Sequence, residues 1–470
     1  MTKKNTKIST NRPQGQAGLE FIGEITGYTH RGHGVTRHNG RVVFVPKALK
    51  GEVLQIKIVG KKQGVLTGEV VKIIKASPGR NDEICPAAAS CGGCALQHAD
   101  YAEQKSIKAE IVKNALERIG SLPDIVEKIK PVMGKDVPLA YRGKGIFRLN
   151  HSGVRYNLGF MAEGSHSVTD YRCILLFPEQ VNRLLSLLEN LLNGGYENLA
   201  AATDRIMVKT TAFNQELMLI LFIKKRQKTK AVLAAAEKLY GELRAANLNL
   251  RVFGYTVDSG EPNPLYTNLT ILSRDTVITE KLAGTLYEIS PASFFQVSPK
   301  QAEKMLLYIK DLINNVIEKK EHLQIIDAYS GIGTIGLALA GCAESVDCIE
   351  IVPQAVWDAE KNCRLNNLQN VRCYCGKAEE LFDEVSRSRP AAAARLVIID
   401  PPRKGCHPAL LQGILDFAAE YVIYVSCNPS TLGRDLAVLT EKYEVQSVQP
   451  IDFFPQSYHV ECVVSLKRRG

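Results

Sequence analysis

A cysteine between a predicted strand and a proline is the first residue of this sequence that could do chemistry. Cys427 follows the apolar run Tyr421 to Tyr424 and precedes Pro429 by two residues. Open α/β sheets place their chemistry at the carboxyl ends of strands. Pro429 disfavours a regular helix directly after Cys427 and favours an extended Asn428, which predicts a thiol on a stiff turn. Taken alone, Cys427 is better interpreted as a small core residue, because free cysteine is among the most buried residue types.

Two further stretches favour a reactive thiol instead. Ile398-Ile399-Asp400-Pro401-Pro402-Arg403 ends another predicted strand with a carboxylate, two rigid prolines and a cation. His459-Val460-Glu461 offers a second carboxylate. A thiolate nucleophile with a general base is a common pairing in covalent catalysis. Glu461 alone would be interpreted as an exposed strand carboxylate.

A glycine-containing turn follows a predicted strand that ends at Asp327. Gly331, Gly333 and Gly336 match the dinucleotide pattern G-x-G-x-x-G, so a nicotinamide enzyme is one candidate. With Asp327 the spacing becomes D-x-x-x-G-x-G, which is typical of the S-adenosylmethionine (SAM) methyltransferase sheet. Glu350 ends the next predicted strand about twenty residues after the glycines, where an acid can bind both ribose hydroxyls of a nucleoside.

Three cysteines form the motif Cys85-x5-Cys91-x2-Cys94, in which two glycines allow a tight turn. A fourth thiolate is needed to complete a metal site, and Cys173 is the best candidate, since the other cysteines lie in the last third of the chain. Four thiolates suit an iron–sulfur cluster or a structural zinc ion. Zinc sites more often pair two C-x2-C motifs, so the single one here favours iron–sulfur. The alternative is that these cysteines bind no metal.

Composition narrows the class of protein. The 470 residues suggest roughly three domains, at about 150 residues each. The net charge of +10 fits a polyanionic partner, although a solvated basic surface is the simpler interpretation. No run of about eighteen apolar residues predicts a membrane span. Residues 1–12 lack the apolar segment of a secretory signal, so we expect a cytoplasmic protein with reduced cysteines and no disulfides.

The chain before the cysteine motif predicts a tail and a small β domain. Residues 1–16 are polar without apolar periodicity, which predicts disorder. Residues 17–76 contain about five short β-rich runs, which predict an OB-like barrel. Such barrels commonly bind single-stranded or looped RNA, and a purely structural barrel is the alternative. The basic residues that cluster in its predicted loops and strand ends are Arg31, Arg37, Arg41, Lys47, Lys50, Lys61 and Lys62.

The remaining chain predicts two larger domains. Residues 77–295 read as a central α+β domain, with a helix over 101–119 and a strand over 141–149. Arg142 and Lys144 would project from the same side of that strand, either to bind phosphates or to face water. Residues 296–470 alternate strands and helices as in a doubly wound sheet, and a helix is predicted to start with Ser298 as its N-cap.

Together these motifs resemble the bacterial RNA uracil-C5 methyltransferases, in particular the iron–sulfur 23S rRNA (uracil-5-)-methyltransferases. The resemblance covers nearly the whole chain, including the barrel, which that family calls a TRAM domain, and the cysteine motif. It also includes Phe294-Phe295-Gln296, the SAM turn, Asp-Pro-Pro-Arg, Ser-Cys-Asn-Pro and the terminal His-x-Glu. The chain departs from some members at Thr334, where they carry Asn, and at Ala378, where they carry a polar cofactor contact.

The resemblance implies a multidomain α/β enzyme that forms 5-methyluridine at a specific uridine of 23S rRNA. It implies that Cys427 is the nucleophile and Glu461 the base, and a nearby cation such as Arg403 is expected to favour the thiolate. The implied SAM contacts are Gln296, Tyr329, Glu350 and Asp400. The implied ligands of a [4Fe-4S] cluster, expected to be structural, are Cys85, Cys91, Cys94 and Cys173.

Other functions stay open from the sequence. The same chemistry could act on the T-loop of tRNA, since relatives of this family modify either RNA. A non-catalytic iron–sulfur RNA-binding protein with a SAM fold would lack a nucleophile or base, and both are present. A nicotinamide dehydrogenase would need a pyrophosphate site and a hydride acceptor, and the sequence offers neither. No obligate protein partner is evident.

Overall fold

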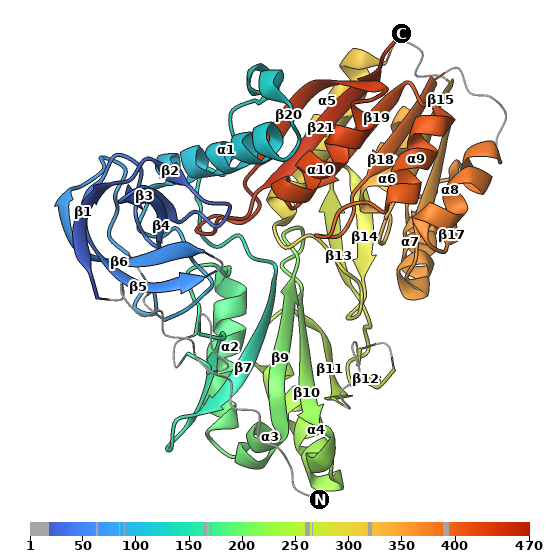
Figure 1. Ribbon diagram of the computed structural model, residues 1–470. Helices are drawn as coiled ribbons and strands as arrows, with labels where there is room; N and C mark the ends of the chain where they lie inside the picture. Colours follow the sequence, from blue (N-terminus) through green and yellow to red (C-terminus); the bar gives the residue numbers. More distant parts are fainter. Residues whose placement is uncertain are drawn as a thin grey trace, which may run out of the picture. The chain divides into compact units, whose positions relative to one another are not determined.

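The computed structural model in Figure 1 describes most of the chain. The described residues are 18–62, 64–83, 85–88, 90–162, 167–169, 172–258, 264–265, 267–317, 322–388 and 394–470. The tail predicted at 1–16 lies outside them. Contacts divide the chain into two compact units. The first contains the chain up to residue 84 with Ala95–Ile111 and Gln456–Tyr458, and the second contains Cys85–Cys94, Val112–Pro455 and His459–Gly470. The predicted domain boundaries stay predictions.

The first unit is built on a six-stranded sheet in the order β1-β5-β6-β4-β3-β2, drawn in blue in Figure 1. Its buried side chains, among them Ile25, Val43 and Leu54, form a core of their own. The turn predicted at Asn39-Gly40 joins β3 to β4, with both residues at positive φ. The β-rich N-terminal domain expected from the sequence is confirmed. The strands are β1 (Glu20–Glu24), β2 (Gly27–Tyr28), β3 (Gly34–His38), β4 (Arg41–Val45), β5 (Val53–Lys62) and β6 (Val65–Lys75).

The second unit contains a mixed sheet in the order β12-β11-β10-β9-β7-β8. Leucines of α2 and α4 are buried in the same core as the apolar side chains of β9 and β10. The strand predicted from Tyr141 begins at Lys144. Helix α1 (Tyr101–Arg118) begins in the first unit and ends in the second. The elements that follow it are η1 (Pro123–Lys128), β7 (Lys144–His151), β8 (Tyr156–Gly159), α2 (Glu179–Leu192), α3 (Glu197–Ala202), β9 (Thr203–Thr210), β10 (Leu217–Lys224), η2 (Lys225–Gln227), α4 (Lys230–Ala245), β11 (Leu250–Asp258) and β12 (Leu269–Ile271).

The same unit contains a seven-stranded sheet in the order β17-β16-β15-β18-β19-β21-β20. The first five strands in this order are parallel to one another. Strand β21 runs antiparallel to β19, and β20 runs antiparallel to β21. Helix α9 packs with α8 and α10, and α6 packs with α5 and α7, so helices cover both faces (Figure 1). The predicted doubly wound sheet is confirmed.

The elements of this part follow one another as strand and helix, after a hairpin. They are β13 (Ile278–Leu282), β14 (Thr285–Ile289), α5 (Pro299–Val316), β15 (Leu323–Ala328), α6 (Thr334–Leu339), η4 (Ala340–Cys342), β16 (Ser345–Glu350), α7 (Pro353–Leu365), β17 (Val371–Cys375), α8 (Ala378–Arg387), β18 (Ala394–Ile399), α9 (Pro408–Phe417), β19 (Tyr421–Ser426), α10 (Pro429–Leu439), β20 (Tyr443–Ile451) and β21 (Glu461–Arg468).

The turn between β15 and α6 explains the spacing of its glycines. Asp327 is fully buried, and its Oδ2 accepts a hydrogen bond from the Gly336 amide at 2.8 Å. A Cβ at Gly336 would lie 2.7 Å from Cys348 Sγ, so only glycine fits there without a shift. Gly331 and Gly333 have φ of +58° and +79°, which glycine adopts without steric cost. The hydrogen bond from the Gly336 amide to the buried carboxyl group of Asp327 therefore fixes the conformation of the turn.

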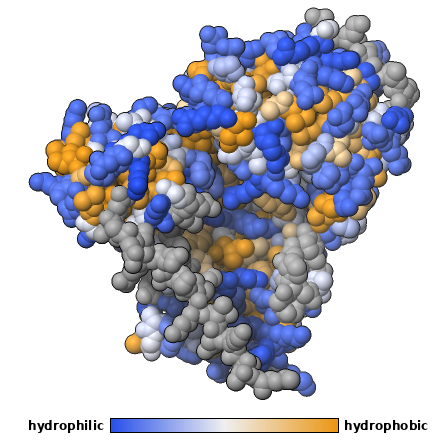
Figure 2. Space-filling view, viewed as in Figure 1, coloured by the Kyte–Doolittle hydropathy of each residue, from blue (hydrophilic) through white to orange (hydrophobic). Residues whose placement is uncertain are grey.

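The face of the molecule shown in Figure 2 carries hydrophilic and hydrophobic residues side by side, which is usual because apolar atoms contribute much of the surface of a folded protein. Among the described residues, no helix is long and apolar enough to cross a membrane.

Candidate active site

Three predicted site residues meet at one edge of the seven-stranded sheet. Strands β18 and β19 run parallel with Ile399 opposite Tyr424, so Asp400 and Cys427 both lie just past their carboxyl ends. Strand β21 runs antiparallel to β19 with Cys462 opposite Ser426, which brings Glu461 beside Cys427. The register of three strands therefore gathers side chains from three separate sequence motifs.

Burial controls the protonation of these groups. It raises the pKa of Cys427 to about 12, with further contributions from Glu461 and Asp400, while Arg403 lowers it. Burial and then Asp400 raise the pKa of Glu461 to about 8, which Arg403 also opposes. Burial raises the pKa of Asp400 to about 7. Arg403 therefore acts on Cys427 in the expected direction, towards the thiolate, but burial and the two carboxyl groups outweigh it and leave the pKa raised.

The loop after Cys427 differs from the prediction in one respect. Asn428 is extended as expected, with φ of −142°, but α10 begins at Pro429 itself. Proline is favoured at the first helical position because it needs no hydrogen-bond donor there. Asn428 caps this helix by accepting from the Ser430 amide at 3.1 Å, and its Nδ2 donates to the carbonyl of Arg403 at 2.9 Å. Cys427 thus precedes a helix amino terminus, whose dipole favours a thiolate.

Three of the four predicted SAM contacts lie at the same sheet edge. Tyr329 follows β15, Glu350 ends β16 and Asp400 follows β18. Strand order reverses between β15 and β18, and ligands of open α/β sheets bind at such a point. The Glu350 carboxylate accepts from the amides of Gly331 at 3.0 Å and Val352 at 2.8 Å, which fixes its orientation. Their roles as SAM ligands stay predictions.

Gln296, the fourth predicted contact, lies outside the sheet in a segment held by a buried lysine. Lys209 of β9 is 3% exposed, and its Nζ donates to the carbonyls of Ser290 at 2.9 Å and Ser293 at 2.7 Å. The hydroxyls of both serines donate to Asp358 of α7. Burial, and then Lys144, lower the pKa of Lys209 well below its ordinary value.

The sequence interpretation did not identify Lys209. The available signal was a lysine directly after the short apolar run Ile206 to Val208 of β9. This lysine fixes the chain three residues before Gln296, so we assign it a positioning role.

The four predicted cluster ligands all belong to the second unit. Cys94 and Cys173 pack against the core of the mixed sheet, and Cys91 forms an isolated β-bridge with Ala162. Burial raises the pKa of Cys173, and Cys91 and Cys85 are near enough to raise it further. Four thiols are the donor set that an iron–sulfur cluster uses. No three His, Cys, Asp or Glu side chains of the described chain are grouped as around a metal ion, so the cluster stays a prediction.

Replacing Lys209 by Met should lower the free energy of unfolding by about 2 kcal/mol, because two buried carbonyls lose their donor. It should also weaken SAM binding roughly tenfold, since the segment before Gln296 is released. Calorimetric titration with SAM and thermal unfolding measure both effects. Lys224→Met is the matched control, because the exposed Lys224 also donates to one carbonyl, that of Ala201. Equal effects of the two substitutions on SAM affinity would contradict the positioning role.

Comparison with known families agrees with this arrangement. The family described as tRNA (Uracil-5-)-methyltransferase matches residues 138–469, and the TRAM domain matches residues 24–71. The resemblance to uracil-C5 methyltransferases and the TRAM assignment are confirmed.

Relatives and one solved structure extend over nearly the whole chain. An RNA methyltransferase of Bacillus cereus is 34% identical over 96% of this chain and 97% of its own length. One of Caldanaerobacter subterraneus is 36% identical over 96% and 98%. The crystal structure of Pyrococcus abyssi tRNA (uracil-54, C5)-methyltransferase with S-adenosyl-L-homocysteine shares the fold, with a TM-score of 0.72 at 21% identity over 95% of this chain and 100% of that one.

These matches are to methyltransferases, so they exclude the alternative that the protein is a nicotinamide dehydrogenase. They support SAM as the methyl donor and RNA as the substrate, without deciding which RNA. The chain therefore belongs to the tRNA (uracil-5-)-methyltransferase family and is a SAM-dependent RNA uracil-C5 methyltransferase.

Proposed function

We propose that the protein methylates C5 of a specific uridine in 23S rRNA through a covalent bond between Cys427 and C6 of the base. The observation that supports this mechanism most is the strand register that brings Cys427 and Glu461 together from motifs more than thirty residues apart. Uracil C5 is a weak nucleophile, and addition of a thiolate at C6 is what makes it reactive.

The chemistry needs one sulfur nucleophile and one base. Addition forms the S–C6 bond, and the electrons of the C5–C6 double bond pass into an enolate with density on C5. Bound SAM would supply an electrophilic methyl group on a positively charged sulfonium: the enolate electrons would form the C5–CH3 bond as the sulfonium–methyl bond breaks, leaving a neutral thioether. Glu461 then removes the C5 proton, the C5–C6 double bond forms again, and the S–C6 bond breaks to return the Cys427 thiolate.

The surroundings of Cys427 suit a base taken out of its stack. Pro401 is buried and Pro402 is exposed, which gives a rigid flat surface without an amide to satisfy. A flipped nucleotide costs a few kcal/mol of unstacking, which contacts in its pocket must offset. Arg403 and the amino end of α10 favour the charged forms of Cys427 and Glu461 that the reaction uses.

A 5-fluorouracil transcript tests the covalent step, because fluorine at C5 cannot be removed as a proton. With SAM, the wild-type protein should form an adduct that survives denaturing electrophoresis, and Cys427→Ala should form none. Glu461→Gln should trap an adduct on unmodified RNA and turn over at least about a hundredfold more slowly. Cys375→Ala is the matched control, since this exposed cysteine ends β17, the edge strand of the same sheet. An adduct with Cys427→Ala would disprove the assignment.

The choice of 23S rRNA rests on the cysteine motif, which resembles the iron–sulfur rRNA enzymes. The T-loop uridine of tRNA is the second candidate, favoured by the description of the matched family. A strain without this gene should lose 5-methyluridine at a 23S rRNA position and keep it in tRNA, as mapped by mass spectrometry of RNA digests. Complementation with Cys427→Ala should not restore the methyl group. Loss from tRNA alone would reassign the substrate.

We further propose that Cys85, Cys91, Cys94 and Cys173 hold a [4Fe-4S] cluster that stabilises the central domain. Methyl transfer moves no single electrons, so the cluster has a structural role. Cys91→Ser should lower iron and sulfide content, solubility and RNA affinity in protein purified without oxygen, whereas Cys342→Ser should change none of them. Zinc in place of iron, or unchanged folding and RNA binding in Cys91→Ser, would refute this.

A further inference from the structure

A pocket of about 460 Å³ is lined by none of the residues assigned to catalysis or SAM binding. It is bordered by the first turn of α5, the end of β9 and the chain that leads into β7. Its lining includes three lysines, Lys135, Lys300 and Lys304, and one acid, Asp136. The pocket therefore carries an excess of positive charge.

The charges of Lys300 and Lys304 repel that of Lys135. Burial lowers the pKa of Lys135 to about 8, and repulsion from Lys300 and Lys304 contributes next, against a smaller opposing effect of Asp452 and Asp136. The Lys304 ammonium is held in place by donating to the carbonyl of Gly134 at 3.1 Å. An anion in this pocket would relieve the repulsion between the three lysines.

The backbone adds to this charge. Helix α5 has eighteen residues and begins at the pocket with Pro299, and Ser298 at its N-cap makes no side-chain capping bond. The amino end of a helix carries partial positive charge and favours anions such as phosphate.

A buried amide in the pocket lining needs a donor. Gln301 is fully buried, and its Nε2 donates to the carbonyls of Asp452 at 3.0 Å and Met133 at 3.3 Å. Its Oε1 makes no hydrogen bond within the described chain. A phosphodiester has no O–H with which to supply this donor, whereas a sugar hydroxyl does.

We propose that this pocket binds a phosphodiester of the RNA substrate, with the adjoining ribose hydroxyl donating to Gln301. Phe213 follows the lining residue Ala212 and is 49% exposed, with Lys281 Nζ 5.7 Å from its ring centroid. An exposed aromatic ring beside a phosphate site is a surface on which a base can stack. The inference rests on RNA as the substrate and holds for either candidate RNA.

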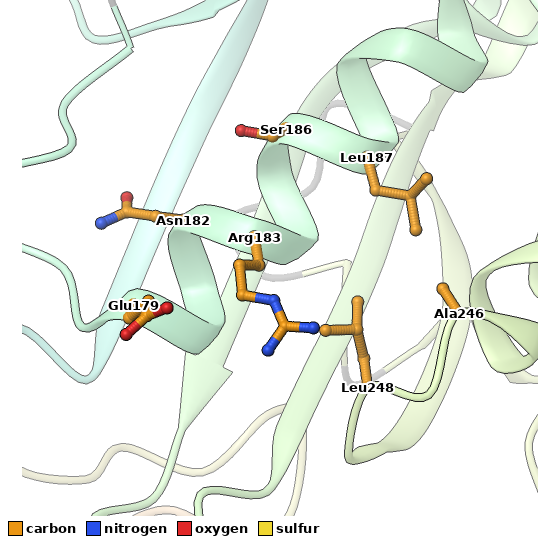
Figure 3. A pocket seen from close by; sticks show the side chains of 7 residues that line it. All are labelled: Glu179, Asn182, Arg183, Ser186, Leu187, Ala246 and Leu248. Carbon is orange, nitrogen blue, oxygen red and sulfur yellow. The ribbon is translucent and has the colours of Figure 1, made fainter.

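A second pocket shows what such a site requires. It is lined by one face of α2 with Ala246 and Leu248, and Figure 3 shows a single cation there, Arg183. Glu179 offsets this charge, and the Ser186 hydroxyl already accepts from Arg172 at 2.8 Å. With one cation, one acid and apolar neighbours, this second pocket is not suited to a phosphate.

Two lysines of α5 provide a matched test. Lys304 lines the pocket and Lys310 does not, yet each donates to one carbonyl, of Gly134 and of Ala283. Lys304→Met should weaken RNA binding roughly fivefold and reduce the slope of log K against log salt by about 0.7, the value for one phosphate of a single strand. It should raise KM for RNA and leave kcat and KM for SAM unchanged. Lys310→Met should leave the salt slope unchanged.

The possible results distinguish a failure of the pocket assignment from a failure of the proposed function. Inorganic phosphate should compete with RNA for the wild-type protein and less for Lys304→Met, with thermal unfolding confirming that both variants fold. An unchanged salt slope in Lys304→Met, or the same loss in Lys310→Met, would overturn the proposal. Methylation of a different RNA, or failure of the 5-fluorouracil adduct, would leave the pocket assignment standing.

Discussion

The pairing of β19 with both β18 and β21 is the constraint on which the active site depends. A strand places successive side chains on opposite faces, so a shift of one residue would turn Glu461 away from Cys427. The pairing of Ser426 with Cys462 prevents this, because apolar residues of both strands are buried on the two sides of the sheet. The core thereby determines which carboxyl group meets the thiol.

The same burial that fixes the geometry opposes ionisation. Cys427, Glu461 and Asp400 all have a raised pKa, and burial is the largest cause in each case. Burying unpaired charges in this site would cost several times the free energy that a typical hydrogen bond contributes to stability. Burial therefore favours the neutral forms of these groups, while Arg403 opposes it at Cys427 and Glu461. Burial also raises the pKa of Asp327, whose carboxyl group has a structural role because it accepts the hydrogen bond that fixes the glycine turn.

The sequence was sufficient for those parts of the site that lie at strand ends. Asp400, Cys427 and the glycine turn each follow an apolar run, and parallel strands present such ends at one edge, so their meeting could be expected. The start of α10 at Pro429 could not be separated from a turn, because proline is compatible with both. The pKa of Cys427 could not be predicted either, since it depends on how deeply three segments bury it together. Lys209 and Lys304 act through tertiary contacts with carbonyls, which leave no spacing in the sequence.

Strand β9 connects the two halves of the reaction. Neighbouring side chains of a strand point to opposite faces, so Lys209 holds the carbonyls of Ser290 and Ser293 while Thr210 lines the proposed phosphate pocket. The chain from Ser293 then passes through Gln296 and enters α5, whose first turn forms another wall of that pocket. A displacement of β9 would therefore move the segment before the predicted SAM contact and the RNA pocket together. Because this strand is buried in the core of the mixed sheet, the two positions are held at a fixed separation. The mixed sheet thus fixes the predicted SAM contact relative to the proposed RNA pocket, as the seven-stranded sheet fixes Cys427 relative to Glu461.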